Sequence, residues 1–348
     1  MRSPETPFSQ FRSLKTFKRR PLLSQEALVK LEYLSDKNSL PLVIQPKIAD
    51  VSLIDWVKSN VDYIENGLLE SGGILFRGFD VTSPADFNDF LKAIPVELMS
   101  YMEGATPRVE LKDKVYTSTE FPPDQHIALH NELCYVTTWP MKIWFYCKKA
   151  AREGGQTPIG DVRKVYTRID PRIRARFEEH GWMLVRNFGD GFGLKWQTSY
   201  RTTSKVELEE YFRRADIEFE WKEGDRLRTR QVRPVAAVHP KTGEKVWFNH
   251  TAFWHVSSLP LKLREMFLAE FGEEELPFNT YYGDGAPIED EVVNVLRQAY
   301  LEETVAFKWQ EGDILMLDNM LTAHGRFPFE GEREVLVAMG QPFSLKAA

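Results

Sequence analysis

Residues 128–135 read Ala128-Leu129-His130-Asn131-Glu132-Leu133-Cys134-Tyr135, a run of strand-forming residues around a histidine and a glutamate. Residues i and i+2 of a strand face the same side, so a strand here would aim the His130 imidazole and the Glu132 carboxylate at one point. Two ligands do not close a metal site, and a third has to come from elsewhere in the chain. By the same parity Asn131 faces away from that point, and we expect its side chain to make a structural hydrogen bond.

Composition indicates a well-packed protein. The chain has 348 residues, of which 43% are hydrophobic, enough to bury a large core in one to three domains. Its formal net charge of -6 gives no reason to expect nucleic acid or an anionic membrane as a partner. The sequence shows no signal-peptide pattern, and no run approaches the ~20 apolar residues of a membrane helix. Cys134 and Cys147 are too few for a disulfide framework, which favours a reducing, cytoplasmic compartment.

The first residues differ in composition from the rest. Residues 1–25 are rich in lysine and arginine, and we predict a flexible, solvated tail there. The alternative is a docking arm for an acidic partner such as a carrier protein. No internal repeat or low-complexity linker divides the remainder of the chain, so residues 26–348 are predicted to form one domain.

Strands and helices alternate along the whole chain. Apolar spacing predicts helices over residues 52–69, 85–94, 171–180, 205–214, 261–271 and 288–303. Strands are predicted over residues 74–76, 139–149, 182–186, 232–238, 245–249, 314–317 and 333–339. The strand over 139–149 alternates, with Lys142 and Lys148 on its polar face, and is expected to be half-buried. The fold class is therefore mainly β with flanking helices, as a distorted antiparallel double-sheet barrel.

The third ligand is predicted to be His324. The chain has seven histidines, and a lone histidine is more often structural than a ligand. His324 differs because it follows an apolar strand and precedes Gly325, where the backbone can pack closely. In a jelly roll a late strand can lie beside an early one, which would bring His324 to His130 and Glu132. Two histidines and one carboxylate are typical of non-haem iron(II) oxygenases.

Two further residues fit a dicarboxylate co-substrate. Arg333 opens a strand whose alternate residues, Val335, Val337 and Met339, would line a barrel interior. A guanidinium there is costly unless it meets an anion, and its planar fork matches a carboxylate. Thr157 offers a hydroxyl donor to the same carboxylate.

The ordered set resembles the taurine dioxygenase-like (TauD/TfdA) family of iron(II)/2-oxoglutarate-dependent oxygenases, in the branch near clavaminate synthase and syringomycin-type aspartyl hydroxylase. The resemblance covers roughly residues 70 to 342. The matching segments are GGILFRGF (72–79), LHNELCY (129–135), GGQTPIGD (154–161), KVWFN (245–249) and the run over 309–342.

The resemblance implies a double-stranded β-helix, a cupin-like jelly roll. It also implies iron(II) bound by His130, Glu132 and His324, 2-oxoglutarate held by Thr157 and Arg333, and dioxygen as the oxidant. Many family members carry aspartate where this chain has Glu132, although glutamate is usual in this branch. The gap from His324 to Arg333 is shorter than in taurine dioxygenase, so Arg326 is a second candidate for the distal carboxylate or a structural partner. A carboxylate at Glu132 also argues against halogenation.

The same resemblance implies hydroxylation of an amino acid or an amino-acid-derived group, free or tethered to a carrier protein, in natural-product biosynthesis. Desaturation, epoxidation and ring closure remain open as outcomes, and so does a homo-oligomer. Asn131, Tyr135, Arg201 and Asn249 are the candidate substrate residues, with Gln197, Trp247 and Trp254 as further pocket candidates.

Two alternatives come from other classes. One is a zinc hydrolase, since the same three ligands can bind zinc and a zinc-bound water is a good nucleophile. This alternative leaves Arg333 and Thr157 without a task. The other is a non-catalytic barrel that binds a small acid, against which the intact set of three ligands argues.

Overall fold

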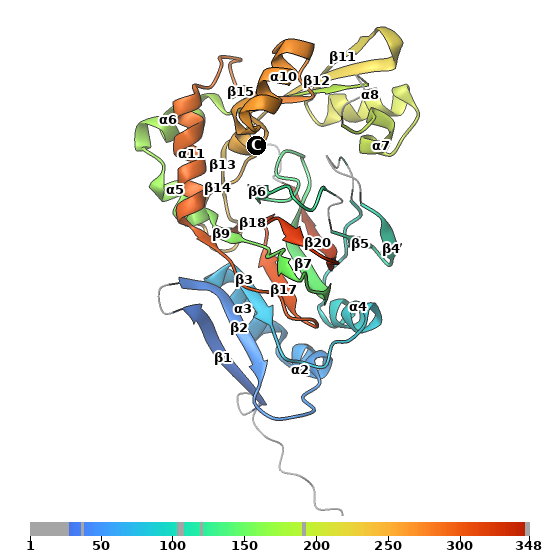
Figure 1. Cartoon of the computed structure of the whole chain (residues 1–348), viewed down its shortest axis with the longest axis vertical. Helices are drawn as coiled ribbons and strands as arrows, with labels where there is room; N and C mark the ends of the chain where they lie inside the picture. The colour runs from blue at the N-terminus through green and yellow to red at the C-terminus, as the bar shows by residue number, and fades with distance from the viewer. Residues whose placement is uncertain are drawn as a thin grey trace, which may run out of the picture.

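The largest sheet has eight strands in the spatial order β1-β2-β3-β17-β7-β20-β5-β4 (Figure 1). The structure is a computed structural model that describes residues 28–35, 38–101, 103, 108–118, 121–189 and 193–344, so the predicted tail lies outside the described residues. The eight strands are β1 (Val29–Ser35), β2 (Asn38–Pro46), β3 (Gly73–Phe76), β17 (Ile314–Asp318), β7 (Trp139–Lys149), β20 (Glu334–Phe343), β5 (Val115–Thr117) and β4 (Glu110–Lys112).

A second sheet of four strands, in the order β16-β9-β18-β6, carries the candidate site. Its members are β16 (Thr304–Val305), β9 (Ile159–Asp161), β18 (Thr322–Arg326) and β6 (Ile127–His130). β18 lies antiparallel to both β6 and β9. A late strand therefore lies beside an early one, as the sequence predicted for His324.

Strand β7 has the predicted bounds but not the predicted exposure. It lies between β17 and β20 and is buried from Trp139 through Cys147. One face packs into the core with Ile143. The other packs with Trp144 against the helices α2 (Leu53–Ser59), α3 (Val61–Ser71) and α4 (Pro84–Ala93). Lys142, expected on a polar face, is 3% exposed and donates hydrogen bonds to Glu65 and to Gln341. The prediction of a half-buried strand was wrong because helices cover the face that alternation assigned to solvent.

Helices flank the sheets. The single helix predicted over 52–69 is two helices, α2 (Leu53–Ser59) and α3 (Val61–Ser71), because Asn60 leaves helical geometry at φ -133° and its side chain donates to the Trp56 carbonyl. The other helices are α4 (Pro84–Ala93), α5 (Val162–Arg168), α6 (Pro171–His180), α7 (Trp196–Tyr200), α8 (Lys205–Arg214), α9 (Thr251–Trp254), α10 (Leu261–Phe271) and α11 (Asp290–Glu302). Every longer helix predicted after residue 84 is confirmed.

A third sheet, in the order β11-β12-β10-β15, stands apart from the first two (Figure 1). Its strands are β11 (Glu218–Lys222), β12 (Arg226–Arg233), β10 (Trp182–Phe188) and β15 (Phe278–Tyr282). The strand predicted over 232–238 is divided by Pro234, which has no backbone N–H to donate to a ladder. Its second half is β13 (Ala236–Val238), which pairs with β14 (Lys245–Trp247). The last pair is β8 (Glu153–Gly154) with β19 (Phe329–Glu330).

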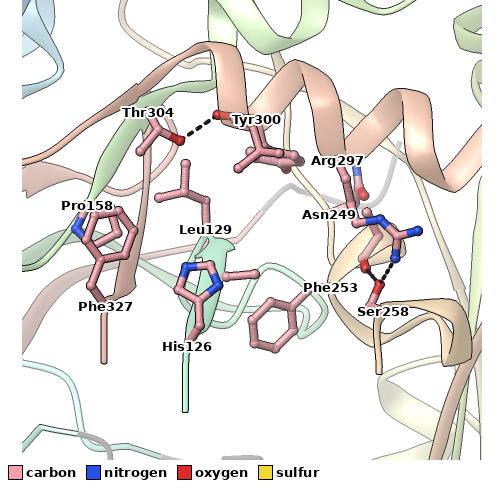
Figure 2. Close-up of a pocket in the computed structure, with 13 residues that line it drawn as sticks. His126, Leu129, Pro158, Asn249, Phe253, Ser258, Arg297, Tyr300, Thr304 and Phe327 are labelled. Atoms are coloured by element: carbon pink, nitrogen blue, oxygen red, sulfur yellow. Dashed lines mark hydrogen bonds between the residues drawn. The ribbon is translucent and has the colours of Figure 1, made fainter. Parts of the chain in front are cut away.

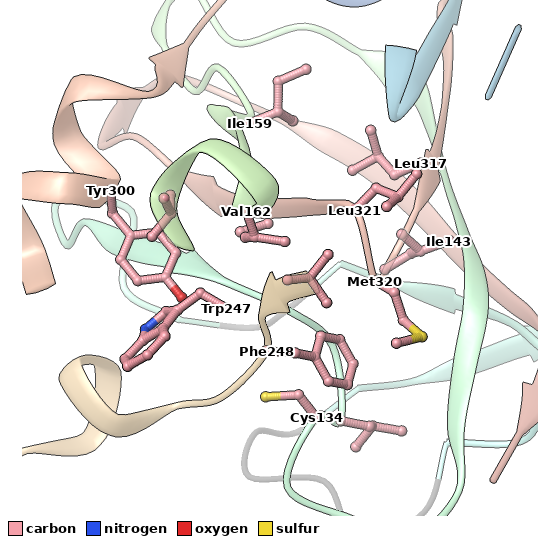
Figure 3. Close-up of a cluster of buried hydrophobic side chains, with 14 of the residues drawn as sticks. Cys134, Ile143, Ile159, Val162, Trp247, Phe248, Tyr300, Leu317, Met320 and Leu321 are labelled. Atoms are coloured by element: carbon pink, nitrogen blue, oxygen red, sulfur yellow. The ribbon is translucent and has the colours of Figure 1, made fainter. Parts of the chain in front are cut away.

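The main core fills the space between the first two sheets and the helices behind them. Figure 3 shows Ile143 and Leu317 of the large sheet near Ile159 of the small sheet and Val162 of α5, all of which are fully buried. Val335, Val337 and Met339 belong to this core. Leu336 and Ala338 belong to a second buried cluster, in which Trp144 packs against the helices α2 to α4. The parity predicted for the last strand is therefore confirmed. In the described part of the chain, no helix is long and apolar enough to cross a membrane.

Candidate active site

Three ionisable side chains converge where β6 meets β18. His130 ends β6 and is paired in register with His324 of β18, and their ring centroids are 4.5 Å apart. Glu132 follows two residues later and is 4% exposed. One ligand atom from each of the three residues lies within 4.8 Å of the others. The structure thus brings together the three residues that the sequence selected as metal ligands.

The backbone conformation that positions Glu132 differs from the predicted strand. β6 ends at His130 and the chain then turns, with Leu133 at a positive φ of 55°. Glu132 is held by Asn319, whose Oδ1 accepts from the Glu132 backbone N–H at 2.8 Å and whose Nδ2 donates to the Glu132 carbonyl at 2.8 Å. The turn, and not strand parity, therefore places the carboxylate beside the histidines.

The donor set suits a divalent cation. Burial lowers the pKa of His130 and of His324, so both rings are neutral and keep a lone pair for a metal. His130 Nδ1 lies 2.9 Å from the Ala128 carbonyl, which fixes the proton on Nδ1 and leaves Nε2 free to coordinate. His324 Nε2 lies 3.7 Å from Glu132 Oε2. Two neutral imidazoles around one buried carboxylate fit an ion such as iron(II).

The Glu132 carboxylate forms an ion pair with a buried arginine, Arg108. Arg108 Nη2 donates to Glu132 Oε2 at 2.7 Å, and both side chains are at most 6% exposed. The guanidinium also lies over the Tyr101 ring, 4.4 Å from its centroid. Burial by itself lowers the pKa of Arg108, but the Glu132 carboxylate raises it above its ordinary value. Arg108 was not predicted from the sequence, because the segment around it has no periodicity and no recognisable motif.

A small inner cavity of about 30 Å³ is lined by two of the three ligands, His130 and His324, and by Arg333. Arg333 Nε donates to the Gly155 carbonyl at 2.9 Å, and its other nitrogens reach the hydroxyls of Ser118 and Thr157, each at 3.4 Å. Burial, and next the nearby Arg326, lower the pKa of Arg333 to about 10. Among the described residues no carboxylate lies within ion-pair distance of it. A partly buried cation with two hydroxyls beside it suits the binding of a carboxylate.

Arg326 is engaged differently. Its Nη1 donates to the Phe121 carbonyl at 2.9 Å, and its Nη2 donates to the carbonyls of Pro122 and Gln125. These bonds tie β18 to the segment before β6, so the geometry favours a structural role for Arg326. Trp309, which was also not predicted, donates from Nε1 to the Thr157 hydroxyl at 3.1 Å and fixes that side chain.

Most of the candidate substrate residues have other partners. The Asn131 side chain is fully buried and donates to the Asn319 carbonyl at 2.6 Å. The predicted structural hydrogen bond is therefore present, although Asn131 lies in the turn after β6 and not on the strand. The Tyr135 hydroxyl donates to the Glu103 carbonyl at 2.8 Å. Arg201 is exposed at the end of α7 in a left-handed conformation. The assignment of Asn131, Tyr135 and Arg201 to a substrate pocket is therefore not supported by their positions.

Of the remaining pocket candidates, three are engaged elsewhere and one lines a cavity. Gln197 donates to the Asp225 carboxylate at 2.9 Å, and Trp247 is fully buried against Phe177. Trp254 stacks on Phe278 and lies edge-on to His250. Asn249 alone lines a cavity, a larger one of about 310 Å³ that Figure 2 shows beside α11. Its amide nonetheless donates to the Val235 carbonyl at 2.8 Å.

Replacing Asn319 with alanine is expected to loosen Glu132. The substitution removes three bonds, to the Glu132 backbone N–H and carbonyl and to the Pro140 carbonyl at 2.9 Å. Buried groups left without partners cost about 1–3 kcal/mol each, so the protein should be less stable by roughly 3 kcal/mol or more. Loss of a group that orients a ligand lowers metal affinity by about 10–100-fold. Urea denaturation and anaerobic iron(II) titration measure the two effects.

Asn187 provides the matched control, because its buried amide also makes three bonds, to Glu274, Leu276 and Arg228. Asn187→Ala should lower stability but leave iron(II) affinity unchanged. Equal losses of metal affinity in the two variants would show that Asn319 has no particular role at the ligand.

Comparison with known proteins places the chain in a family. The family model described as "Taurine catabolism dioxygenase TauD, TfdA family" matches residues 36–339. The chain is 40% identical over 279 residues to the dapdiamide synthesis protein DdaC of Enterobacter agglomerans, over 80% of this chain and 85% of that protein. It is 32% identical over 327 residues to a clavaminate synthase-like protein of Arabidopsis thaliana, over 87% of this chain and 94% of that protein.

Solved structures agree in fold. The PvcB protein from Pseudomonas aeruginosa superposes with a TM-score of 0.55 at 15% identity, covering 92% of this chain and 93% of that one. Another structure of PvcB, described as an Fe, alpha-ketoglutarate dependent oxygenase, gives a TM-score of 0.53 at 15% identity over 91% and 93% of the two chains. At this identity the likeness concerns the fold alone. The family model and the 40% identical relative carry the assignment: the chain belongs to the TauD, TfdA family and is an iron(II)- and 2-oxoglutarate-dependent dioxygenase.

Proposed function

We propose that this dioxygenase hydroxylates an unactivated C–H bond of an amino acid or an amino-acid-derived substrate. The observation that carries the proposal is the inner cavity, which runs from His130 and His324 to Arg333 and Thr157. A metal site at one end and a carboxylate cradle at the other match the two ends of 2-oxoglutarate. The arrangement of the large and small sheets around this cavity supports a double-stranded β-helix.

Each residue has a defined task in this proposal. His130, Glu132 and His324 would hold iron(II). Arg333 and Thr157, with Ser118 beside them, bind the distal carboxylate of 2-oxoglutarate. Once bound, these groups supply an oxidant that takes hydrogen from the substrate, while 2-oxoglutarate is converted to succinate and carbon dioxide. Glu132 and His324 are buried and His130 is partly buried, which limits the access of water to this chemistry.

The substrate class rests on a relative. DdaC is a dapdiamide synthesis protein, and its 40% identity to this chain supports an amino-acid-derived substrate in natural-product biosynthesis. A carrier-tethered form of the substrate is part of the proposal. Hydroxylation is the default outcome, with desaturation, epoxidation and ring closure as outcomes of the same site. Glu132 takes a metal position that a halide would need, which favours oxygenation over halogenation.

The two alternatives from other classes do not hold. A zinc hydrolase and a non-catalytic barrel both conflict with membership in a dioxygenase family over residues 36–339. They also give no task to Arg333, which lies partly buried and without an acidic partner among the described residues.

The proposal is tested by product analysis. Purified protein with iron(II), 2-oxoglutarate and ascorbate is supplied with a panel of free amino acids and with the same amino acids as pantetheine thioesters. We expect one class of substrate to stimulate succinate formation and to gain one oxygen atom from isotopically labelled dioxygen. A product that loses two hydrogens and gains no oxygen would replace hydroxylation by desaturation or ring closure. Turnover of free amino acids only would remove the tethered substrate from the proposal.

A further inference from the structure

The larger cavity lies on the opposite face of the small sheet from the inner one. Neighbouring residues divide between the two cavities at two places in the chain. In β6, Leu129 lines the larger cavity and His130 lines the inner one. Just before β9, Pro158 lines the larger cavity and Thr157 lines the inner one. Successive residues of extended chain point to opposite faces. Ala128 and Leu129 are the exception and both line the larger cavity, because the pairing of β6 with β18 shifts register at these two residues. The cavity measures about 310 Å³, against about 30 Å³ for the inner one, and is bounded by α9 and α11 (Figure 2). It is therefore a separate space and not an extension of the co-substrate site.

The lining is mostly apolar, and three of its polar side chains lie together on one side. Two further polar residues, His126 and Thr304, line other parts of the cavity. The apolar and aromatic members are Ala128, Leu129, Pro158, Ala252, Phe253, Tyr300, Leu301 and Phe327. Figure 2 shows Arg297, Asn249 and Ser258 together at one side of the cavity, away from Pro158 and Phe327. Among the described residues that line it, none is acidic. A space of this size and composition suits a small organic molecule with an apolar body and one polar end.

The polar end carries an uncompensated positive charge. Arg297 Nη1 donates to the Ser257 carbonyl at 2.8 Å and to the Ser258 hydroxyl at 3.0 Å, so neutral groups hold the guanidinium in place. In the described part of the chain no carboxylate is within ion-pair distance of Arg297. The charge of Asp290 influences Arg297, but Asp290 is already bonded to Arg264 at 2.7 Å. Burial lowers the pKa of Arg297, as expected for a cation that lacks a counter-ion.

We propose that this outer cavity binds a small amphipathic carboxylate, with its apolar body against Leu129, Phe253 and Tyr300 and its carboxylate on Arg297. The site goes beyond the proposed oxygenase function, because its ligand does not enter the inner cavity. The outer cavity nonetheless shares a wall residue with one of the metal ligands. Phe253 lines the outer cavity and also packs on His130, with ring centroids 4.8 Å apart.

Octanoate and 1-octanol are the probes, since they share an apolar chain and differ in the charged end. The full-length protein is titrated by calorimetry without oxygen, in the presence of iron(II) and saturating 2-oxoglutarate, so that the inner cavity is occupied. We expect one octanoate per chain and weaker binding of octanol. Arg297→Met should weaken octanoate binding by about tenfold or more, as for a lost charge-assisted hydrogen bond, and should leave octanol binding unchanged.

Three further variants separate this site from others and control for charge. Ala128→Trp places a large side chain at an exposed lining position and should abolish binding of both probes. Arg333→Met should leave octanoate binding intact, because Arg333 lines only the inner cavity. Arg172→Met, an exposed arginine outside the cavity, controls for net charge. The inference is overturned if octanoate does not bind, if Arg297→Met and Arg172→Met behave alike, or if binding survives Ala128→Trp.

Discussion

Glu132→Ala is expected to have two separable effects, loss of iron(II) binding and loss of stability in the metal-free protein. The first follows from the removal of one of three ligands. The second follows from Arg108, whose guanidinium is buried on this carboxylate at 2.7 Å. Removing one partner of a buried ion pair costs about 3–5 kcal/mol, because the other charge stays buried. Urea denaturation without metal measures the stability, and anaerobic titration with iron(II) measures binding.

The double variant Glu132→Ala/Arg108→Met distinguishes the two effects. An apolar side chain of similar length replaces the stranded cation, and well-packed apolar replacements of buried ion pairs are often neutral or stabilising. Stability should therefore return towards that of the native chain, while iron(II) binding stays lost. If the double variant were as unstable as Glu132→Ala, the instability would come from the turn at residues 131–136 and not from Arg108.

The two histidine ligands could be predicted from the sequence more securely than Glu132 or its partner Arg108. His130 and His324 lie on strands whose apolar runs and positions are visible in the sequence, and their pairing follows from the sheet order. Glu132 was selected for a reason that the structure replaces, since a turn held by Asn319 positions it. Arg108 could not be found, because its position depends on a tertiary contact that leaves no periodic pattern.

The fold shows the same division between local and tertiary information. The longer helices were predicted because their apolar faces repeat every three or four residues. The exposure of β7 was not, since it depends on helices from residues 53 to 93 covering its second face. The outer cavity has no sequence signature either. Leu129, Phe253 and Arg297 come from three distant segments, and each alone reads as an ordinary core or surface residue.

Arg333→Met is expected to weaken 2-oxoglutarate binding by roughly 2–4 kcal/mol, as for the loss of a partner to a buried charge. Such a change corresponds to about 30-fold to 1,000-fold in affinity. The reason is that Arg333 is a cation at the far end of the inner cavity with the Ser118 and Thr157 hydroxyls beside it. Anaerobic titration of the visible charge-transfer band of the iron(II)–2-oxoglutarate complex measures the affinity.

Arg326→Met is the informative comparison, since Arg326 also lines the inner cavity. Its Nη1 and Nη2 donate to three backbone carbonyls, so its loss leaves those carbonyls unsatisfied and should lower the free energy of unfolding. The affinity for 2-oxoglutarate should change much less than in Arg333→Met. If the two variants exchanged these effects, Arg326 would be the residue that binds the distal carboxylate, and Arg333 would serve to tie Gly155 to the start of β20. That reversal would also require the Arg326 guanidinium to leave its three backbone carbonyls when 2-oxoglutarate binds, and the stability of Arg326→Met should then be close to that of the native chain.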